Sequence, residues 1–212
     1  MSRSTSRAVL AATIACACVA LWPAIGRAQS WFESDDAGEL TSSAQSTIGA
    51  GSLARITGQL SDANDVDLFC IRILDPATFV AELDCAVQSD PDIWLFSRTV
   101  ANGVAHQTLC QSGHKRVTGA FVNAEGMYYL AIACEGREAM GPNGVIWNTV
   151  LSSTQRAPDG PGAPGPLTGW GGPGTSSPLM HYTIRLTGAT FADAPATTDG
   201  VSWGRIKVLY HE

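Results

Sequence analysis

Residues 56–96 read ITGQLSDANDVDLFCIRILDPATFVAELDCAVQSDPDIWLF, and apolar and polar side chains alternate along much of this stretch. The segment 65–73 carries Phe, Ile and Ile at every second position from residue 69, so these side chains share one face. Such alternation is typical of a half-buried β-strand. An Asp-Pro turn follows at 75–76, because proline presets its own backbone angle, and a returning strand is predicted at 79–85.

Further short runs of the same kind follow at close spacing. A denser apolar run at 93–96 precedes an Ala-Asn-Gly turn at 101–103, which is suited to a hairpin into 104–109. No segment shows a sustained helical apolar stripe. The spacing predicts an all-β, antiparallel, jelly-roll-like β-sandwich of about eight strands. Other strands of this set are predicted at 117–122, 127–134 and 181–186.

Three motifs carry a family resemblance. They are Asp-Val-Asp at 65–67, Asp-Pro-Asp at 90–92, and Gly-Met-Tyr-Tyr at 126–129 within NAEGMYYLAIACEG. Together they resemble the bacterial pre-peptidase C-terminal domain, a secreted β-sandwich, over roughly residues 52–190. Such domains usually accompany a catalytic domain, and no peptidase is recognised in this sequence. The resemblance therefore implies a β-sandwich fold and a secreted protein. Because no peptidase is recognised, the domain is expected to act as a free-standing module.

The N-terminus has the layout of a secretory signal peptide. Arg3 and Arg7 precede an apolar run at 8–22, and a small-residue pattern ends at Ala28, where cleavage is expected. Lipoprotein processing at Cys16 is the alternative, although the residues before it make a poor lipobox. No second long apolar span follows, so no transmembrane segment is expected in the mature chain.

The sequence accordingly divides into four parts. They are a signal peptide at 1–28, an N-terminal arm at 29–51, the sandwich at 52–190, and a linker and tail at 191–212 that ends in VSWGRIKVLYHE. Removing the leader removes three arginines and no acid, so the net charge moves from −6 to about −9. An acidic surface disfavours nucleic-acid binding and suits divalent cations.

The cysteines point to disulfides, because the mature chain keeps an even number of them in an exported protein. Four cysteines allow three connectivities. If 65–73 and 79–85 form a hairpin, Cys85 and Cys110 end strands on the same side, which favours that pair. This leaves Cys70 to pair with Cys134, but the two residues fall on different strand faces, so this bridge needs adjacent strands or a local bulge. The four mature cysteines are Cys70, Cys85, Cys110 and Cys134.

Two acidic pairs form the candidate metal site. The same hairpin would bring four carboxylates to one end of the sandwich, with Asn64 and Asp62 nearby, and converging carboxylates suit Ca²⁺. In the alternative, these side chains cap turns by bonding their own backbone. The four candidate ligands are Asp65, Asp67, Asp90 and Asp92.

Tryptophans offer a second kind of site. Trp147 and Trp170 lie in or beside a stretch at 156–178 in which Gly and Pro supply 13 of 23 residues, which predicts a long surface loop. Exposed tryptophans would stack on a ligand such as a sugar ring. The alternative is that they pin the loop to the sandwich.

No catalytic residues are predicted. The sequence has no Gly-x-Ser-x-Gly elbow and no His-Glu-x-x-His helix, and His106, His114 and His181 are scattered. Acid pairs such as Glu135 with Glu138 have the residue types of a glycosidase, without a context that separates their pKa values. The expected function is a secreted binding or adhesion module for a protein or carbohydrate at the cell surface, stabilised by Ca²⁺. An extracellular hydrolase is the alternative.

We expect the exported protein to begin at Gln29, because signal peptidase cleaves after a small residue such as Ala28. Intact-mass analysis of secreted material checks this. A soluble product that retains residues 1–28 would contradict it.

Overall fold

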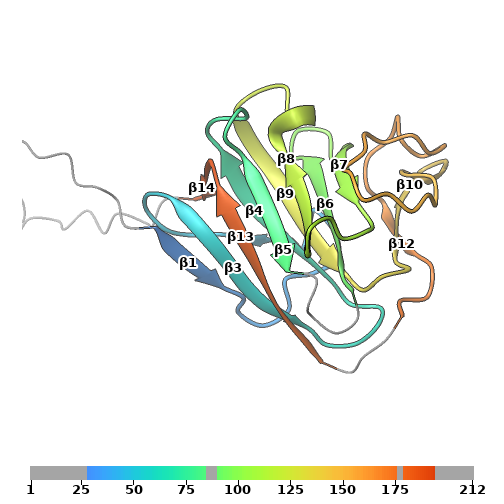
Figure 1. Cartoon of the computed structure of the whole chain (residues 1–212), viewed down its shortest axis with the longest axis horizontal. Coiled ribbons are helices and arrows are strands. Elements are labelled where there is room, and N and C mark those ends of the chain that lie inside the picture. Colours follow the sequence, from blue (N-terminus) through green and yellow to red (C-terminus); the bar gives the residue numbers. More distant parts are fainter. Residues whose placement is uncertain (1–27, 85–89, 176–178, 194–212) are drawn as a thin grey trace, which may run out of the picture.

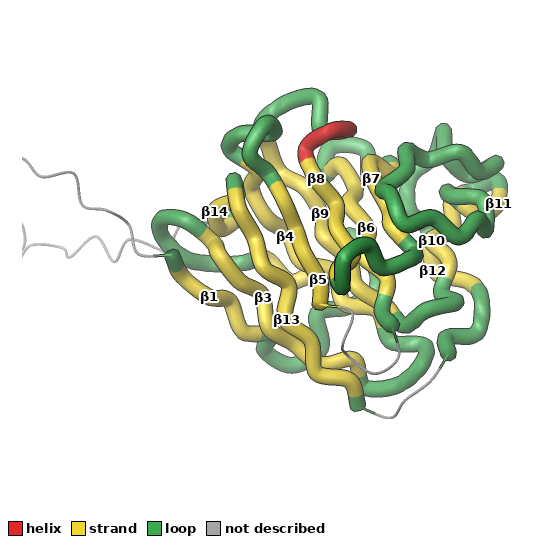
Figure 2. Tube along the Cα trace, viewed as in Figure 1, coloured by secondary structure: helices red, strands yellow, loops and turns green. Residues whose placement is uncertain are grey.

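Two β-sheets stack face to face in the computed structural model, which describes residues 28–84, 90–175 and 179–193 (Figure 1). A smaller sheet lies beside them, and nearly all regular structure is strand (Figure 2). A single 3₁₀ turn, η1 (Gly119–Phe121), is found in the described part. Within these ranges no helix has the length and apolarity needed to cross a membrane.

The first sheet has five strands, and their spatial order differs from their order in the chain. In spatial order they are β1 (Gln29–Phe32), β3 (Leu53–Leu60), β13 (Met180–Thr187), β5 (Val80–Asp84) and β8 (His114–Thr118).

The second sheet packs against the first, and the third is a short ribbon at one end of the molecule (Figure 1). The second sheet runs β14 (Ala189–Phe191), β4 (Val66–Ile73), β9 (Gly126–Ala133), β6 (Asp92–Ser97) and β7 (Gly103–Gln107), and β2 (Gln45–Ser46) pairs with β4. The third sheet runs β11 (Gly144–Val145), β10 (Glu138–Gly141) and β12 (Gly169–Gly171).

The predicted β-sandwich is confirmed, with 14 strands among the described residues instead of about eight. The strands predicted near 65–73, 93–96 and 127–134 are β4, β6 and β9. The excess consists of short strands. Two of them, β1 and β2, belong to the N-terminal arm and pair in parallel with β3 and β4, which sequence periodicity does not show.

The expected hairpin between residues 65–73 and 79–85 is wrong. β4 pairs with β9 and β14 in the second sheet, whereas β5 pairs with β13 and β8 in the first. The Asp-Pro turn forms as predicted, with Asp75 Oδ1 accepting a hydrogen bond from the Ala77 N–H at 2.9 Å. This turn carries the chain from one sheet to the other, so the two strands face each other across the core.

An inner core fills the space between the two main sheets. Phe69, Ile71 and Ile73 of β4 lie in it, as their alternation predicts, and all three are fully buried. They meet residues of the first sheet such as Ile56 and Ile184. Strand β13 alternates between buried and exposed or half-buried side chains along its whole length, because its other face meets solvent.

A second, outer core lies on the opposite face of the second sheet. It contains Val66, Leu68, Trp94 and Phe96 from the strands. Its covering residues are Ala139, Ile146, Trp147 and Leu167, each at most 6 % exposed. The Gly/Pro-rich stretch is therefore part of a cover over an apolar sheet face, and its interpretation as a surface loop alone is corrected.

The proposed Cys70–Cys134 disulfide is wrong, because both cysteines are free and buried. Cys70 lies in the outer core and Cys134 in the inner core, on opposite faces of the same sheet. Cys110 is disulfide-bonded. Its predicted partner Cys85 lies outside the described residues, as do the leader up to residue 27 and the tail from residue 194.

When the mature protein is denatured without reductant, we expect two thiols per chain to be alkylated, those of Cys70 and Cys134. Mass spectrometry counts the labels, and a Cys70→Ala variant should retain one. No labelled thiol would mean that the two cysteines are bridged, and four would mean that Cys110 is not bonded.

Candidate functional site

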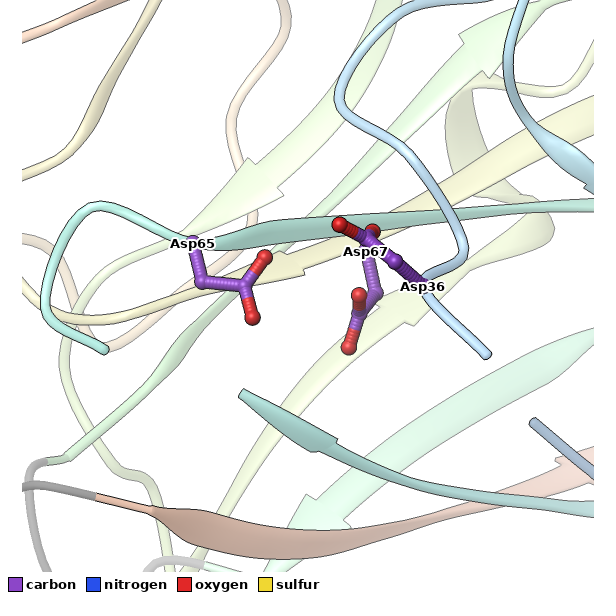
Figure 3. Close-up of side chains that lie close together, drawn as sticks. All are labelled: Asp36, Asp65 and Asp67. Carbon is purple, nitrogen blue, oxygen red and sulfur yellow. The ribbon is translucent and has the colours of Figure 1, made fainter. Parts of the chain in front are cut away.

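Three aspartates meet where the N-terminal arm joins the sandwich. Asp65 immediately precedes β4, Asp67 is its second residue, and Asp36 lies in the loop after β1. One ligand oxygen from each lies within 4.8 Å of the others. Figure 3 shows Asp65 pointing from the strand toward Asp67, with Asp36 approaching from the arm. We call these residues the aspartate cluster.

Backbone pairing brings Asp36 to this position. β1 pairs in parallel with β3, and the Glu33 N–H donates to the Thr57 carbonyl at 2.9 Å. The chain then turns at Asp35, whose φ of 56° is left-handed. Beyond the turn, the Gly38 carbonyl accepts a hydrogen bond from the Leu68 N–H of β4 at 3.1 Å. The arm is thus hydrogen-bonded to both sheets, with the aspartate cluster between these contacts.

Glu33 lies next to the aspartate cluster and is the neighbour that sequence analysis missed. Its Oε2 accepts from the Gln59 N–H at 2.7 Å and its Oε1 from the Ala37 N–H at 3.2 Å. Burial raises the pKa of Glu33, and these backbone hydrogen bonds oppose that rise. Gly58 leaves room for the side chain, because a Cβ there would collide with Glu33 Oε2 and the Tyr182 hydroxyl.

Asp67 is fully buried and faces the inner core. Its Oδ2 accepts a hydrogen bond from the Tyr182 hydroxyl at 2.6 Å, while its Oδ1 has no hydrogen-bond partner. Burial raises the pKa of Asp67 to about 9; the bond from Tyr182 opposes this, and the charges of Glu33 and Asp65 add to it. At neutral pH and without a cation, Asp67 therefore holds a proton.

The proton on Asp67 also explains how this carboxyl group can lie close to that of Glu33. Two ionised carboxylates only accept hydrogen bonds, so they repel until one is protonated. The negative charge of Glu33 adds to the rise in the pKa of Asp67. Glu33 already accepts hydrogen bonds from two backbone N–H groups, so Asp67 is the carboxyl that keeps the proton.

Asp90 and Asp92 do not join the aspartate cluster, so the expected convergence of four carboxylates is corrected. Lys115 Nζ lies 2.6 Å from Asp92 Oδ1 and 3.0 Å from Asp90 Oδ1. The reason is strand parity. Asp92 alternates with Ile93, which faces the inner core, so Asp92 faces outward, whereas Asp67 faces inward.

Turn capping, the alternative role for these acids, occurs beside the aspartate cluster. Asp62 Oδ1 accepts from the Asn64 N–H at 2.6 Å, and Asp65 Oδ2 accepts from the Ser61 N–H at 2.5 Å. Asp62 is thus a turn cap. Asp65 uses one oxygen as a cap and is still within reach of Asp36 and Asp67.

An open pocket of about 430 Å³ adjoins the aspartate cluster. Phe32 stands at its edge with 66 % of its surface exposed. Acidic residues and residues of β3 line the pocket together with apolar surface. Its lining includes Glu33, Asp36, Thr57, Gln59, Asp65 and His181.

Trp147 does not present an open ring for a ligand, since it is 1 % exposed and packs edge-on against Phe96 at 5.7 Å between ring centroids. Its Nε1 donates to the Arg156 carbonyl at 3.2 Å. Trp170 is half-buried, packs edge-on against Trp94 at 5.0 Å, and donates to the Glu39 carbonyl. Both side chains thus hold the segment that covers the outer core against the rest of the protein, which is the alternative given for them in the sequence analysis.

No protein-family model matches this chain, and no curated protein matches its sequence. Fold and geometry therefore define its class: a β-sandwich with two cores, whose N-terminal arm meets the sandwich at a cluster of aspartates.

In a buffer with chelator, we expect the free energy of unfolding to fall as pH rises from about 4 toward about 9. The folded state keeps a proton on Asp67 that the unfolded chain loses above its ordinary pKa of 3.8. The slope should approach 1.4 kcal/mol per pH unit, roughly the value of one proton. An Asp67→Asn variant stays neutral and should flatten this slope in denaturant titrations. A Glu125→Gln variant, at an exposed position, is the control, and equal slopes in all three proteins would contradict the assignment.

Proposed function

We propose that this protein is an exported, non-catalytic β-sandwich module that binds Ca²⁺ at Asp36, Asp65 and Asp67 and acts in binding or adhesion at or outside the cell envelope. One observation carries the proposal: a buried aspartate oxygen without a hydrogen-bond partner lies in a group of three carboxylates from two separate segments. Buried polar atoms without partners are rare in native proteins and call for a ligand or an ion.

The donor chemistry favours calcium over softer metals. The aspartate cluster offers carboxylate oxygens, and Glu33 and the open pocket supply further oxygen atoms beside it. Ca²⁺ takes six to eight oxygen ligands in a flexible geometry, and it accepts water at positions that the protein leaves open. Zinc and copper prefer imidazole and thiolate ligands.

Binding would replace the proton on Asp67 with the cation. A carboxylate must be deprotonated to act as a metal ligand, so its apparent affinity rises with pH toward its own pKa. In exchange, the positive charge of the cation would offset the burial of the Asp67 carboxylate and its repulsion with Glu33 and Asp65, which together keep Asp67 protonated. Calcium would thus fasten the arm to β4, because one ligand comes from the arm and two from the strand.

Export is supported by the arginine-flanked apolar leader and by the disulfide at Cys110. The motifs of the pre-peptidase C-terminal domain agree with a secreted sandwich. The pocket beside the aspartate cluster, with the exposed ring of Phe32, is the candidate surface for a protein or carbohydrate partner.

The hydrolase alternative requires a histidine or serine within hydrogen-bond reach of a carboxylate in a cleft. Two histidines approach carboxylates: His114 Nδ1 lies 3.6 Å from Glu82 Oε1, and His106 Nε2 lies 3.8 Å from Asp92 Oδ2. Both separations exceed hydrogen-bond length. This geometry favours binding over catalysis.

Added Ca²⁺ should raise the melting temperature of the mature protein, and a chelator should lower it. The expected stabilisation is about 2.7 kcal/mol at a hundredfold excess over the dissociation constant. Calorimetry should show affinity rising between about pH 6 and pH 8 as Asp67 gives up its proton.

The response should vanish in an Asp36→Asn, Asp65→Asn double variant. The Glu125→Gln control removes one exposed acid elsewhere and should respond like the wild type. If melting is indifferent to millimolar calcium, the aspartate cluster is a proton-sharing network and binds no cation.

A further inference from the structure

A second, smaller pocket of about 160 Å³ lies where the ends of β6 and β7 meet the segment 135–151. We call it the outer pocket, because it lies on the outer-core side of the second sheet. Its inner residues are Asp92 and His106, and its wall and mouth include Glu135, Glu138, Val150 and Leu151.

His106 is the unusual residue of the outer pocket. It is 3 % exposed, yet neither of its ring nitrogens has a hydrogen-bond partner. Its ring stacks on Trp94 at 4.6 Å between centroids, and Trp147 packs against it edge-on at 5.5 Å. The two indoles hold the ring in place without satisfying its nitrogens. A buried imidazole must donate from one nitrogen and accept at the other, so this side chain needs polar partners from within the pocket.

Asp92 accepts a hydrogen bond from the described residues through only one of its two carboxylate oxygens. Its Oδ1 accepts a hydrogen bond from Lys115 Nζ at 2.6 Å, and this buried lysine orients the carboxylate. In the described part of the chain, no residue donates a hydrogen bond to Oδ2, which lies 3.8 Å from His106 Nε2. Lys115 also contacts Asp90, so one cation is shared between two carboxylates.

The hydrogen-bond donors around the outer pocket are largely used within the protein. Thr149 Oγ1 donates to Glu138 Oε1 at 3.0 Å, and Thr108 Oγ1 donates to the Ser152 carbonyl at 3.3 Å. Asn148 Nδ2 donates to the Asp159 carbonyl at 2.7 Å. The unpaired groups are mostly acceptors, namely one oxygen of Asp92, one of Glu138 and one ring nitrogen of His106, while the other ring nitrogen of His106 is an unpaired donor.

We propose that the outer pocket binds a primary ammonium group on a short aliphatic stem, as in a lysine side chain of a partner or a small alkylamine. An ammonium has three donors and no acceptor, which matches a lining in which unpaired acceptors outnumber unpaired donors. Val150 and Leu151 are exposed at 50 % and 67 % and provide apolar surface for the stem. The volume is below that of typical drug-sized sites and suits a single side chain.

The spacing of the acceptors favours an ammonium over a metal ion. Among the described residues, only the aspartate cluster brings three ligand atoms within 4.8 Å of one another. No three such atoms from the described residues of the outer pocket meet this limit, and N–H···O contacts to an ammonium are longer than bonds from oxygen to Ca²⁺, so an ammonium tolerates a wider spacing of acceptors. Arg137 lies next in sequence to these acids, but its Nη1 is directed to the Gly172 carbonyl at 2.7 Å. Glu135 and Glu138 therefore add negative charge at the mouth.

The test is a titration of the mature protein with Nα-acetyl-lysine N-methylamide, followed by NMR chemical shifts. The matched neutral probe is Nα-acetyl-norleucine N-methylamide, which has the stem without the charge. We expect the lysine compound to bind at least tenfold more tightly. Butylamine separates the two sources: equal affinity indicates a free amine as ligand, and weaker binding indicates a peptide side chain.

Variants localise the binding. Glu138→Gln should weaken it about tenfold, and His106→Phe should do the same while keeping a ring between the indoles. Glu125→Gln, remote from the pocket, should have no effect. The proposal is overturned if neither amine binds, if the norleucine compound binds equally well, or if the Glu138 and His106 variants bind like the wild type.

Discussion

The structure depends on the burial of β4, β9 and β6 on both faces. Their inward side chains meet the first sheet, and their outward side chains meet the cover formed by residues 139–170. Fully burying one large apolar side chain contributes about 1.5–3 kcal/mol, so an uncovered outer face would forfeit a large share of the stability. This explains why a stretch so rich in Gly and Pro is ordered: Trp147 and Leu167 anchor it on Phe96 and its neighbours.

The same two-faced burial separates acids that lie near the start of two strands of one sheet. Asp67 and Asp92 lie near the same end of the second sheet, with β9 between them. Asp67 faces the inner core and meets Tyr182 and Glu33, so it keeps a proton. Asp92 faces the opposite side and meets Lys115 and His106. One sheet end thus carries two chemically different groups of side chains, a protonated aspartate among other carboxylates and an aspartate paired with a buried lysine.

The N-terminal arm links these local features to the proposed function. It is joined to the sandwich by parallel pairing of β1 with β3, by Ala37 in the inner core, and by hydrogen bonds of Trp170 and Leu68 to backbone carbonyls of the arm. Asp36 and Glu33 then place negative charge against Asp65 and Asp67, which opposes docking unless a proton or a cation is present. If the aspartate cluster binds Ca²⁺ as proposed, its occupancy and the attachment of the arm are coupled.

The sequence by itself determined the local elements: β4, β6 and β9, the turns at 75–76 and 101–103, and the closeness of Asp65 to Asp67, because periodicity and turn chemistry act over a few residues. Only the tertiary structure decided which sheet each strand joins, and therefore which face each side chain meets. Within the second sheet, strand alternation then placed Cys70 and Cys134, and likewise Asp67 and Asp92, on opposite faces. The choice of strand partners also brought Glu33 and Asp36, from an arm without periodicity, to the aspartate cluster. Strand partners and covered faces are selected by apolar burial between segments distant in sequence, which leaves no mark in local spacing.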